Sequence, residues 1–293
     1  AGPEAAGREP SGDATATGPV AFVLGGGGVH GAAEVGMLRA LLEQGITPDL
    51  ILGTSVGAIN GAALARNPDL EGARRLARLW EELTGGGVFS GSVVARTATL
   101  VKTRTHLHPH GPMRTMMREE FGSARIEDLA VPFQCVAASI ERAREHWFTS
   151  GPVVDAVLAS CAVPGLLPAV QIGGEHFLDG GLVDSIPVGR ALDLGARTVY
   201  VLQVGRVETP LRAPKQPWEV AMISFEIARR HRFSTTMARL PEDVAVHVLP
   251  TGDTLAFNDR RQFRYRDFSA VPTRIDAAYT ASLDYLRDRG LAG

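Results

Sequence analysis

Short apolar runs alternate with helical periodicities along the first part of the chain. The run Val20 to Leu24 ends in glycines, and apolar residues then recur at helical spacing from Val35 to Leu42. The run Leu50 to Leu52 is followed by a tight turn at Gly53 to Gly57 and a helix from Ala58 to Arg66. Two successive units of strand, turn and helix predict a parallel sheet covered by helices.

The remaining sequence continues this alternation. Helices are predicted at 69–84, 113–121, 153–160, 218–239 and 274–289, and strands at 133–139, 146–149, 169–172, 176–178, 198–204 and 244–249. Residues 88–110 have no clean period, and we interpret them either as a lid beside an apolar pocket or as an irregular connection. We predict one α/β domain over residues 19–293, with a mostly parallel central sheet between helices, after a disordered leader at residues 1–18.

Composition and charge limit the classes of function. The formal charge is −2, from 30 basic and 32 acidic residues, so no global positive field favours nucleic acid as a partner. No stretch reaches the roughly 18 apolar residues of a membrane span, and the first 18 residues lack the order of a secretory signal. The cysteines, Cys135 and Cys161, lie in apolar stretches and favour a reduced, cytoplasmic setting. Secretion and peripheral membrane contact stay open.

Two clusters of basic side chains invite other interpretations. His106, His108 and His110 alternate as metal ligands do, but Pro109 interrupts them and no paired carboxylate is near, so we favour a solvent-facing loop and predict no metal. The run Arg229 to Arg232 is typical of a solvated helix face, with contact to anionic lipid headgroups as the alternative.

The motif Gly53-Thr54-Ser55-Val56-Gly57 places a serine between two glycines where a strand turns sharply into a helix. Glycine is needed at both flanking positions because side chains there would collide, and the turn pushes the serine hydroxyl out above the sheet. A structural turn is the alternative interpretation. The predicted strand and helix on either side favour a nucleophile at Ser55.

The glycine loop before this motif allows two functions. Gly26, Gly28 and Gly31 form a GxGxxG pattern, which is typical of dinucleotide binding and would make the chain an oxidoreductase. That fold requires an acidic residue at the end of the second strand, whereas Asp49 precedes Leu50 to Leu52. We therefore favour the second interpretation, in which backbone amides of the loop form an oxyanion hole.

A nucleophilic serine also needs a base. Asp179 follows a predicted strand, and Gly180 and Gly181 allow a close approach of the backbone. If histidine were the base and followed the acid in the chain, only His231 or His247 would qualify, and neither lies in a predicted loop.

Together, these motifs resemble the patatin-like phospholipase family. The resemblance rests on Gly25 to Gly31, Gly53 to Gly57 and Asp179 to Gly181, and on the flanking segments Ala159 to Gly165 and Leu182 to Val188. It implies a three-layer sandwich and lipid acyl hydrolysis through an acyl-enzyme, without cofactor, on a phospholipid or another acyl ester.

The resemblance also implies roles for individual residues. Ser55 and Asp179 would form a catalytic dyad without histidine, and the oxyanion hole would come from the amides of Gly26, Gly27 and Gly28. The supporting motif residues would be His30, Gly31, Gly53, Gly57, Gly180 and Gly181. Many members carry Arg or Lys where this chain has His30, and Gly25 stands where plant members carry Asp, as in the bacterial branch. A weakly active lipid-binding or regulatory protein of the same fold is the alternative.

Overall fold

The computed structural model describes residues 18–86, 109–204, 211, 213–214, 217–252 and 271–292. The predicted leader and most of the segment 88–110 lie outside these residues. The strands are β1 (Val20–Leu24), β2 (Leu50–Thr54), β3 (Phe133–Ser139), β4 (Arg144–Phe148), β5 (Val170–Ile172), β6 (Glu175–Asp179), β7 (Thr198–Leu202) and β8 (Ala245–Val248). The helices are α1 (Ala32–Glu43), α2 (Val56–Arg66), α3 (Leu70–Gly86), α5 (Gly111–Phe121), α6 (Val153–Ser160), α7 (Val188–Asp193), α8 (Pro217–Met237) and α9 (Val271–Asp288).

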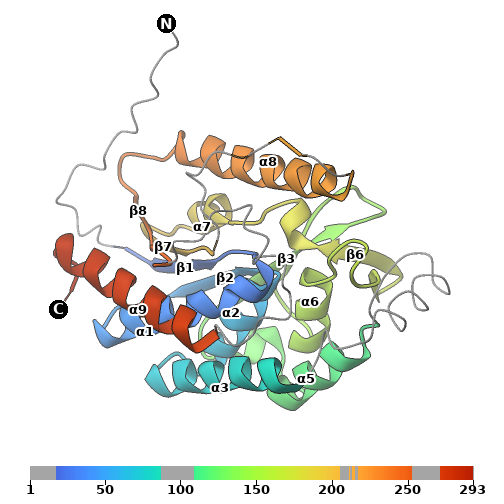
Figure 1. Ribbon diagram of the computed structural model, residues 1–293, viewed down its shortest axis with the longest axis horizontal. Helices are drawn as coiled ribbons and strands as arrows, with labels where there is room; N and C mark the ends of the chain where they lie inside the picture. The colour runs from blue at the N-terminus through green and yellow to red at the C-terminus, as the bar shows by residue number, and fades with distance from the viewer. Residues whose placement is uncertain are drawn as a thin grey trace, which may run out of the picture.

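The described strands form one eight-stranded sheet (Figure 1). Pairing follows the path β5-β6-β3-β2-β1-β7-β8, and β4 pairs with β3 in addition. The ladders from β3 through β2, β1 and β7 to β8 are parallel, as the strand and helix units predict. The ladders of β4, β5 and β6 are antiparallel. A turn at residues 140–143 reverses the chain between β3 and β4, and a turn at Gly173 and Gly174 reverses it between β5 and β6.

Strands β2 and β6 meet end to end along one edge of β3. Val136 pairs with both β2 and β4, whereas the next residue, Ala137, pairs with both β4 and β6. A strand has two edges, so β2 and β6 lie on the same edge, opposite β4. The partner of Val136 on this edge is Thr54, and the partner of Ala137 is Asp179. The end of β2 therefore faces the end of β6.

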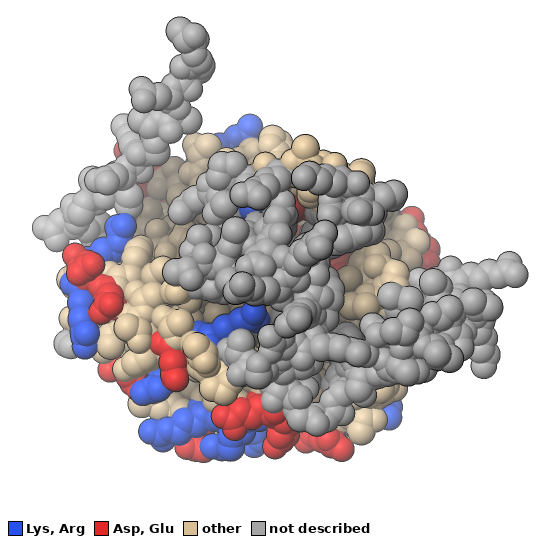
Figure 2. Space-filling model, in the orientation of Figure 1, with Lys and Arg blue, Asp and Glu red and all other residues tan. Residues whose placement is uncertain are grey.

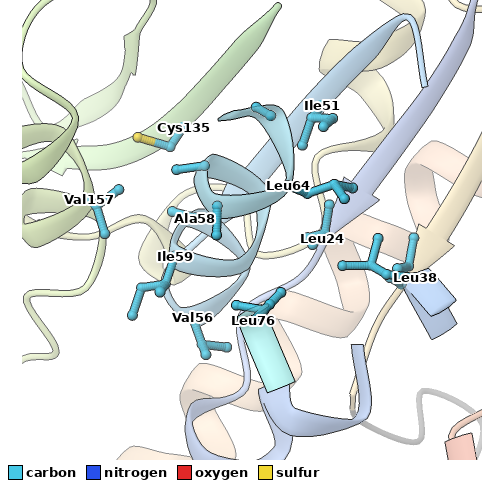
Figure 3. Close-up of a cluster of buried hydrophobic side chains, with 14 of the residues drawn as sticks. Leu24, Leu38, Ile51, Val56, Ala58, Ile59, Leu64, Leu76, Cys135 and Val157 are labelled. Atoms are coloured by element: carbon cyan, nitrogen blue, oxygen red, sulfur yellow. The ribbon is translucent and has the colours of Figure 1, made fainter. Parts of the chain in front are cut away.

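Helices cover both faces of the sheet and enclose two apolar clusters. Along β1, Phe22 and Leu24 join the larger cluster, while Ala21 and Val23 join the smaller one, as the alternation of a strand requires. Residues of α1, α2, α3, α6 and α9 complete the larger cluster, part of which Figure 3 draws around α2. Residues of α7 and Phe233 of α8 complete the smaller one, and Figure 1 shows these two helices on the opposite side of the sheet from α1 and α9.

The prediction that the basic run Arg229 to Arg232 on α8 forms a solvated helix face is wrong for part of the run. Arg229 is buried and binds Glu226 through two hydrogen bonds of 2.6 and 2.8 Å, because a buried guanidinium needs a carboxylate partner. Arg232 is exposed and bonds Glu145 at 2.8 Å and Asp184 at 3.2 Å. Arg232 therefore holds α8 to acidic groups of the fold, whereas the pair of Arg229 and Glu226 lies within α8.

Charges of both signs are interspersed on the face shown in Figure 2. Along α1, Arg39 pairs with Glu43 at 2.8 Å, and along α3, Arg78 pairs with Glu71 at 3.0 Å. Such exposed pairs contribute little to stability. Within the described ranges, no helix combines the length and the apolar composition that a membrane span requires.

The crossing of α1 and α9 depends on a glycine. A Cβ at Gly36 would overlap the carbonyl oxygen of Ile275, which belongs to the α9 backbone. We expect Gly36→Ala to lower the free energy of unfolding by at least about 2 kcal/mol in urea denaturation, because the helices must separate. The matched control is Gly189→Ala in α7. A Cβ added there would lie 3.8 Å from its nearest neighbour, a methyl carbon of Thr236. The stability of this control should be unchanged or raised by up to about 1 kcal/mol, and equal effects of the two substitutions would contradict this packing.

Candidate active site

Ser55 lies at the sharp turn between β2 and α2. Its backbone has φ 55° and ψ −123°, a left-handed conformation that is strained for a residue with a side chain. A Cβ at Gly53 would lie 2.5 Å from the carbonyl oxygen of Gly57, and one at Gly57 would overlap the backbone of Leu24. The two flanking glycines of the motif are therefore required by the close approach of backbone, as predicted.

The hydroxyl of Ser55 donates a hydrogen bond of 2.6 Å to Oδ2 of Asp179. Both residues are buried, at 8% and 4% exposure. The contact follows from the end-to-end arrangement of β2 and β6, which places Asp179 and Thr54, the residue before Ser55, beside consecutive positions of β3. Gly180 is needed there, because a Cβ would overlap the carbonyl oxygen of Val136. The structure thus joins two groups that are 124 positions apart.

Burial makes Asp179 a stronger base than an ordinary aspartate. Its pKa is raised from 3.8 to about 6, chiefly because burial disfavours the charged form. Hydrogen bonds from Ser55 and from the backbone N–H of Gly181, the latter 2.7 Å long, act in the opposite direction. Gly181 therefore orients one carboxylate oxygen and leaves the other to face the serine.

The glycine loop packs directly against Ser55. A Cβ at Gly26 would lie 3.5 Å from the Cβ of Ser55. The N–H of Gly26 donates to the carbonyl oxygen of Ser185 at 3.0 Å, so this amide is already engaged and is a poor candidate for an oxyanion donor. Gly27 and Gly28 are exposed, and their amides bond no backbone acceptor among the described residues.

Two further parts of the loop have structural positions. Gly28 adopts φ 59°, a conformation that favours glycine, and it begins a short 3-10 turn that ends at Gly31. His30 is half-buried in this turn, and its backbone N–H donates to the carbonyl oxygen of Gly27 at 3.3 Å. The turn precedes α1, so the loop and the first helix form one unit.

Sequence reasoning missed several groups that support the turn at Ser55. The hydroxyl of Ser160 accepts a hydrogen bond of 2.9 Å from the N–H of Ser55, which satisfies the amide of the strained turn. The hydroxyl of Thr54 donates to the carbonyl oxygen of Asp184 at 2.8 Å. Burial raises the pKa of the Asp184 carboxyl to about 6, and the nearby Arg232 opposes this effect. Ser160 and Asp184 lie in the two flanking segments of the resemblance, but no local pattern indicates these contacts.

The alternative bases lie elsewhere. His231 is exposed on α8. His247 lies on β8, which is joined to β2 only through β7 and β1, and its ring stacks on that of Tyr200 with centroids 5.0 Å apart. Burial lowers the pKa of His247 below its usual value. Neither histidine contacts Ser55 or Asp179.

The residues of the disfavoured alternatives have other roles in the described part of the chain. The carboxylate of Asp49 accepts a hydrogen bond of 2.8 Å from the N–H of Val20, at the amino end of β1, so it cannot bind a ribose at the carboxyl end. His110 bonds the carbonyl oxygen of Pro168 at 2.6 Å, and His106 and His108 lie outside the described residues. Within the part of the chain that is described, no three His, Cys, Asp or Glu side chains group as metal ligands would.

A strained serine hydrogen-bonded to a buried aspartate, beside a glycine loop on an α/β sheet, is an arrangement suited to nucleophilic catalysis. The profile of a family described as patatin-like phospholipase matches residues 22–192. The match covers more than half of the chain, which therefore belongs to the patatin-like phospholipase family of carboxylic ester hydrolases.

The chain is also similar to individual proteins, by sequence and by structure. Lysophospholipase nte1 of Aspergillus terreus is 35% identical over 189 residues, and its counterpart in Emericella nidulans is 34% identical over the same length. Each alignment covers 64% of this chain but only 12% of the fungal protein. Among solved structures, VipD from Legionella pneumophila aligns with a TM-score of 0.44 at 13% identity, covering 93% of this chain and 67% of VipD. The relatives named here by sequence are fungal, and the bacterial branch stays a prediction.

The strain at Ser55 is measurable with a matched pair of variants. Ser55→Ala and Ser55→Gly both remove the hydroxyl, but only glycine adopts φ 55° without strain. We expect Ser55→Gly to unfold with a free energy about 1 kcal/mol higher than Ser55→Ala in urea denaturation. Equal or lower stability of the glycine variant would contradict a strained turn.

The burial of Asp179 predicts a pH-dependent cost to stability. The folded-state pKa of about 6 lies above the ordinary 3.8, so the protonated form stabilises the fold below pH 4 and this contribution is lost as the pH rises through 6. Asp179→Asn should therefore gain stability over wild type between pH 4 and pH 6, by up to about 3 kcal/mol at pH 8, because a tenfold change in proton affinity corresponds to about 1.4 kcal/mol. Urea denaturation of both proteins at pH 4 and pH 8 measures this gain. A difference in free energy of unfolding between variant and wild type that does not change with pH would contradict it.

Proposed function

We propose that this chain is a serine lipid acyl hydrolase that uses Ser55 and Asp179 as a catalytic dyad. The observation that carries the proposal is the 2.6 Å hydrogen bond between the serine hydroxyl and the buried carboxylate. The family assignment supports the reaction class. The fungal relatives are named lysophospholipases, which supports a phospholipid or lysophospholipid as the acyl-ester substrate.

In the proposed mechanism, Asp179 accepts the proton of Ser55 as the serine oxygen attacks the ester carbonyl carbon. The amides of Gly27 and Gly28 donate hydrogen bonds to the oxyanion of the tetrahedral intermediate. The intermediate collapses to an acyl-enzyme, and the alcohol portion of the lipid leaves with the proton from Asp179. A water molecule that Asp179 deprotonates then attacks the acyl-enzyme, and the second tetrahedral intermediate collapses to the fatty acid as the Ser55 oxygen leaves with the proton from Asp179.

The environment of Asp179 explains how a carboxylate serves as the base. An aspartate of ordinary pKa is too weak, but the pKa of Asp179 near 6 is close to neutral pH, where a general base works best. The hydrogen bond from Gly181 fixes the carboxylate geometry. The burial of Asp179 and the oxyanion donors therefore act together to lower the barrier. Each oxyanion donor contributes about 3 kcal/mol in comparable sites.

Removal of either dyad member should abolish turnover. We expect Ser55→Ala and Asp179→Asn each to lower kcat for a short p-nitrophenyl ester by at least about 10³-fold, with circular dichroism unchanged. A fluorophosphonate probe should label wild type but not Ser55→Ala. The matched controls are His231→Ala and His247→Gln, which should keep kcat within about threefold. Turnover retained by Ser55→Ala would refute the proposal, and loss of activity in a histidine variant would favour a triad.

The pH dependence of catalysis should follow the same carboxylate. Because Asp179 must be ionised to accept a proton, kcat/KM should rise with pH through about 6 and then reach a plateau. Below that pH, each lower unit should cost about tenfold in rate. Initial rates between pH 4.5 and 8.5 measure this profile, and a midpoint near 4 would contradict burial as the source of basicity.

A further inference from the structure

A buried polar cluster lies beneath the glycine loop, apart from the dyad. It consists of Glu34 on α1, Asn60 on α2 and Trp80 on α3. Glu34 and Asn60 are fully buried and Trp80 is 4% exposed. The three helices are the one that follows the glycine loop, the one that follows Ser55 and a third that packs on both. A polar cluster buried at such a junction needs a complete set of partners.

Asn60 connects all the parts of this cluster. Its Nδ2 donates to the carbonyl oxygen of Gly31 at 2.9 Å and to Oε2 of Glu34 at 2.7 Å. Its Oδ1 accepts a hydrogen bond of 3.0 Å from Nε1 of Trp80. The indole N–H can only donate and the Gly31 carbonyl can only accept, so a single orientation of the amide satisfies both. An aspartate at this position would place acceptors against acceptors.

Glu34 is suited to this cluster only as a neutral acid. Complete burial raises its pKa well above the ordinary value, and hydrogen bonds from Asn60 and the backbone of Gly25 oppose this only in part. Its Oε1 has no hydrogen-bond partner in the described part of the chain, so a charge on this oxygen would be uncompensated. The carboxyl group thus lies against both the first residue of the loop, Gly25, and the side chain that holds its last residue, Gly31.

Gly31 also contacts the residue that follows the nucleophile. A Cβ at Gly31 would overlap the side chain of Val56 and would lie 3.0 Å from Cζ2 of Trp80. The end of the loop is therefore held from two sides, by a hydrogen bond on its carbonyl group and by close packing on its Cα. Any shift of Asn60 or Trp80 moves the loop relative to α2, whose first turn begins at Ser55.

We propose that Glu34, Asn60 and Trp80 are positioning residues that fix the glycine loop relative to Ser55 and so set where the oxyanion donors lie. The inference rests on the proposed function. It extends that function to groups that never contact the substrate and act only through the backbone of Gly25 and Gly31. A misplacement of about 1 Å in such a site costs about 10²-fold in rate.

The test separates a positioning role from a purely structural one through the steps of catalysis. Asn60→Asp removes both hydrogen bonds that Nδ2 donates, with little change of shape. Trp80→Phe removes the indole N–H together with part of the buried ring, and Glu34→Gln keeps a neutral acceptor for Asn60. We expect Asn60→Asp to lower kcat for a p-nitrophenyl ester by about 10²-fold and Trp80→Phe by about tenfold, with KM within about threefold of wild type. Glu34→Gln should keep kcat within about threefold, whereas Glu34→Ala should lose about tenfold or more.

A second readout reports the oxyanion hole directly. A trifluoromethyl ketone forms a tetrahedral adduct with a nucleophilic serine, whereas a fatty acid product does not. Asn60→Asp and Trp80→Phe should weaken inhibition by the ketone in parallel with kcat and leave inhibition by the fatty acid within about threefold. The matched control is Leu76→Ala, a buried residue of α3 in the same apolar cluster, which should lower the melting temperature without changing kcat.

The outcomes distinguish the two proposals. If wild type hydrolyses the ester and both Asn60→Asp and Trp80→Phe keep its kcat and ketone affinity, the positioning role is overturned while the proposed function stands. The positioning role is also overturned if Leu76→Ala lowers kcat as much as Asn60→Asp and Trp80→Phe do when the loss of melting temperature is equal. If Asn60→Asp does not fold, Trp80→Phe decides alone. If wild type neither hydrolyses the ester nor reacts at Ser55, the proposed function fails and the positioning role fails with it.

Discussion

The meeting of β2 and β6 along one edge of β3 is the constraint on which the site depends. Strand β2 cannot continue, because β6 occupies the next positions of that edge from the opposite direction. The chain must turn away at Ser55, and the strained turn and the short hydrogen bond to Asp179 both result from this encounter. Glycine is required at three positions around this meeting point, because an added Cβ would clash with neighbouring backbone atoms: Gly53, Gly57 and Gly180.

Burial at this encounter serves chemistry at a cost to stability. A charged carboxylate enclosed by the sheet would be unfavourable without partners, and the two hydrogen bonds on Asp179 only partly offset the loss of water. The same imbalance raises the proton affinity of the carboxylate into the range that a base requires. At Glu34, complete burial likewise outweighs the hydrogen bonds from Asn60 and Gly25, so the pKa of its carboxyl group is raised well above the ordinary value.

Much of the fold follows from local patterns, whereas long-range contacts do not. The apolar runs and helical periods predict the strand at Phe133–Ser139 and the helix at Val153–Ser160 with the observed bounds, because period and burial coincide there. The dyad was predicted from motifs and resemblance, and the structure brings its two members together. The engaged amide of Gly26 and the buried Arg229 were not foreseen, because both depend on partners distant in the sequence. The contact of Ser160 with Ser55 was missed for the same reason.

The hairpin of β5 and β6 places the two residues of the proposed dyad at different distances from the edge of the sheet. Ser55 follows β2, which lies between β1 and β3, whereas Asp179 ends β6, which among the described strands is separated from the edge only by the three residues of β5. Short edge strands open by local fluctuation more readily than central ones. Opening of β5 would leave β6 as the edge strand, so we expect the position of Asp179 to be more sensitive to such fluctuations than the position of Ser55.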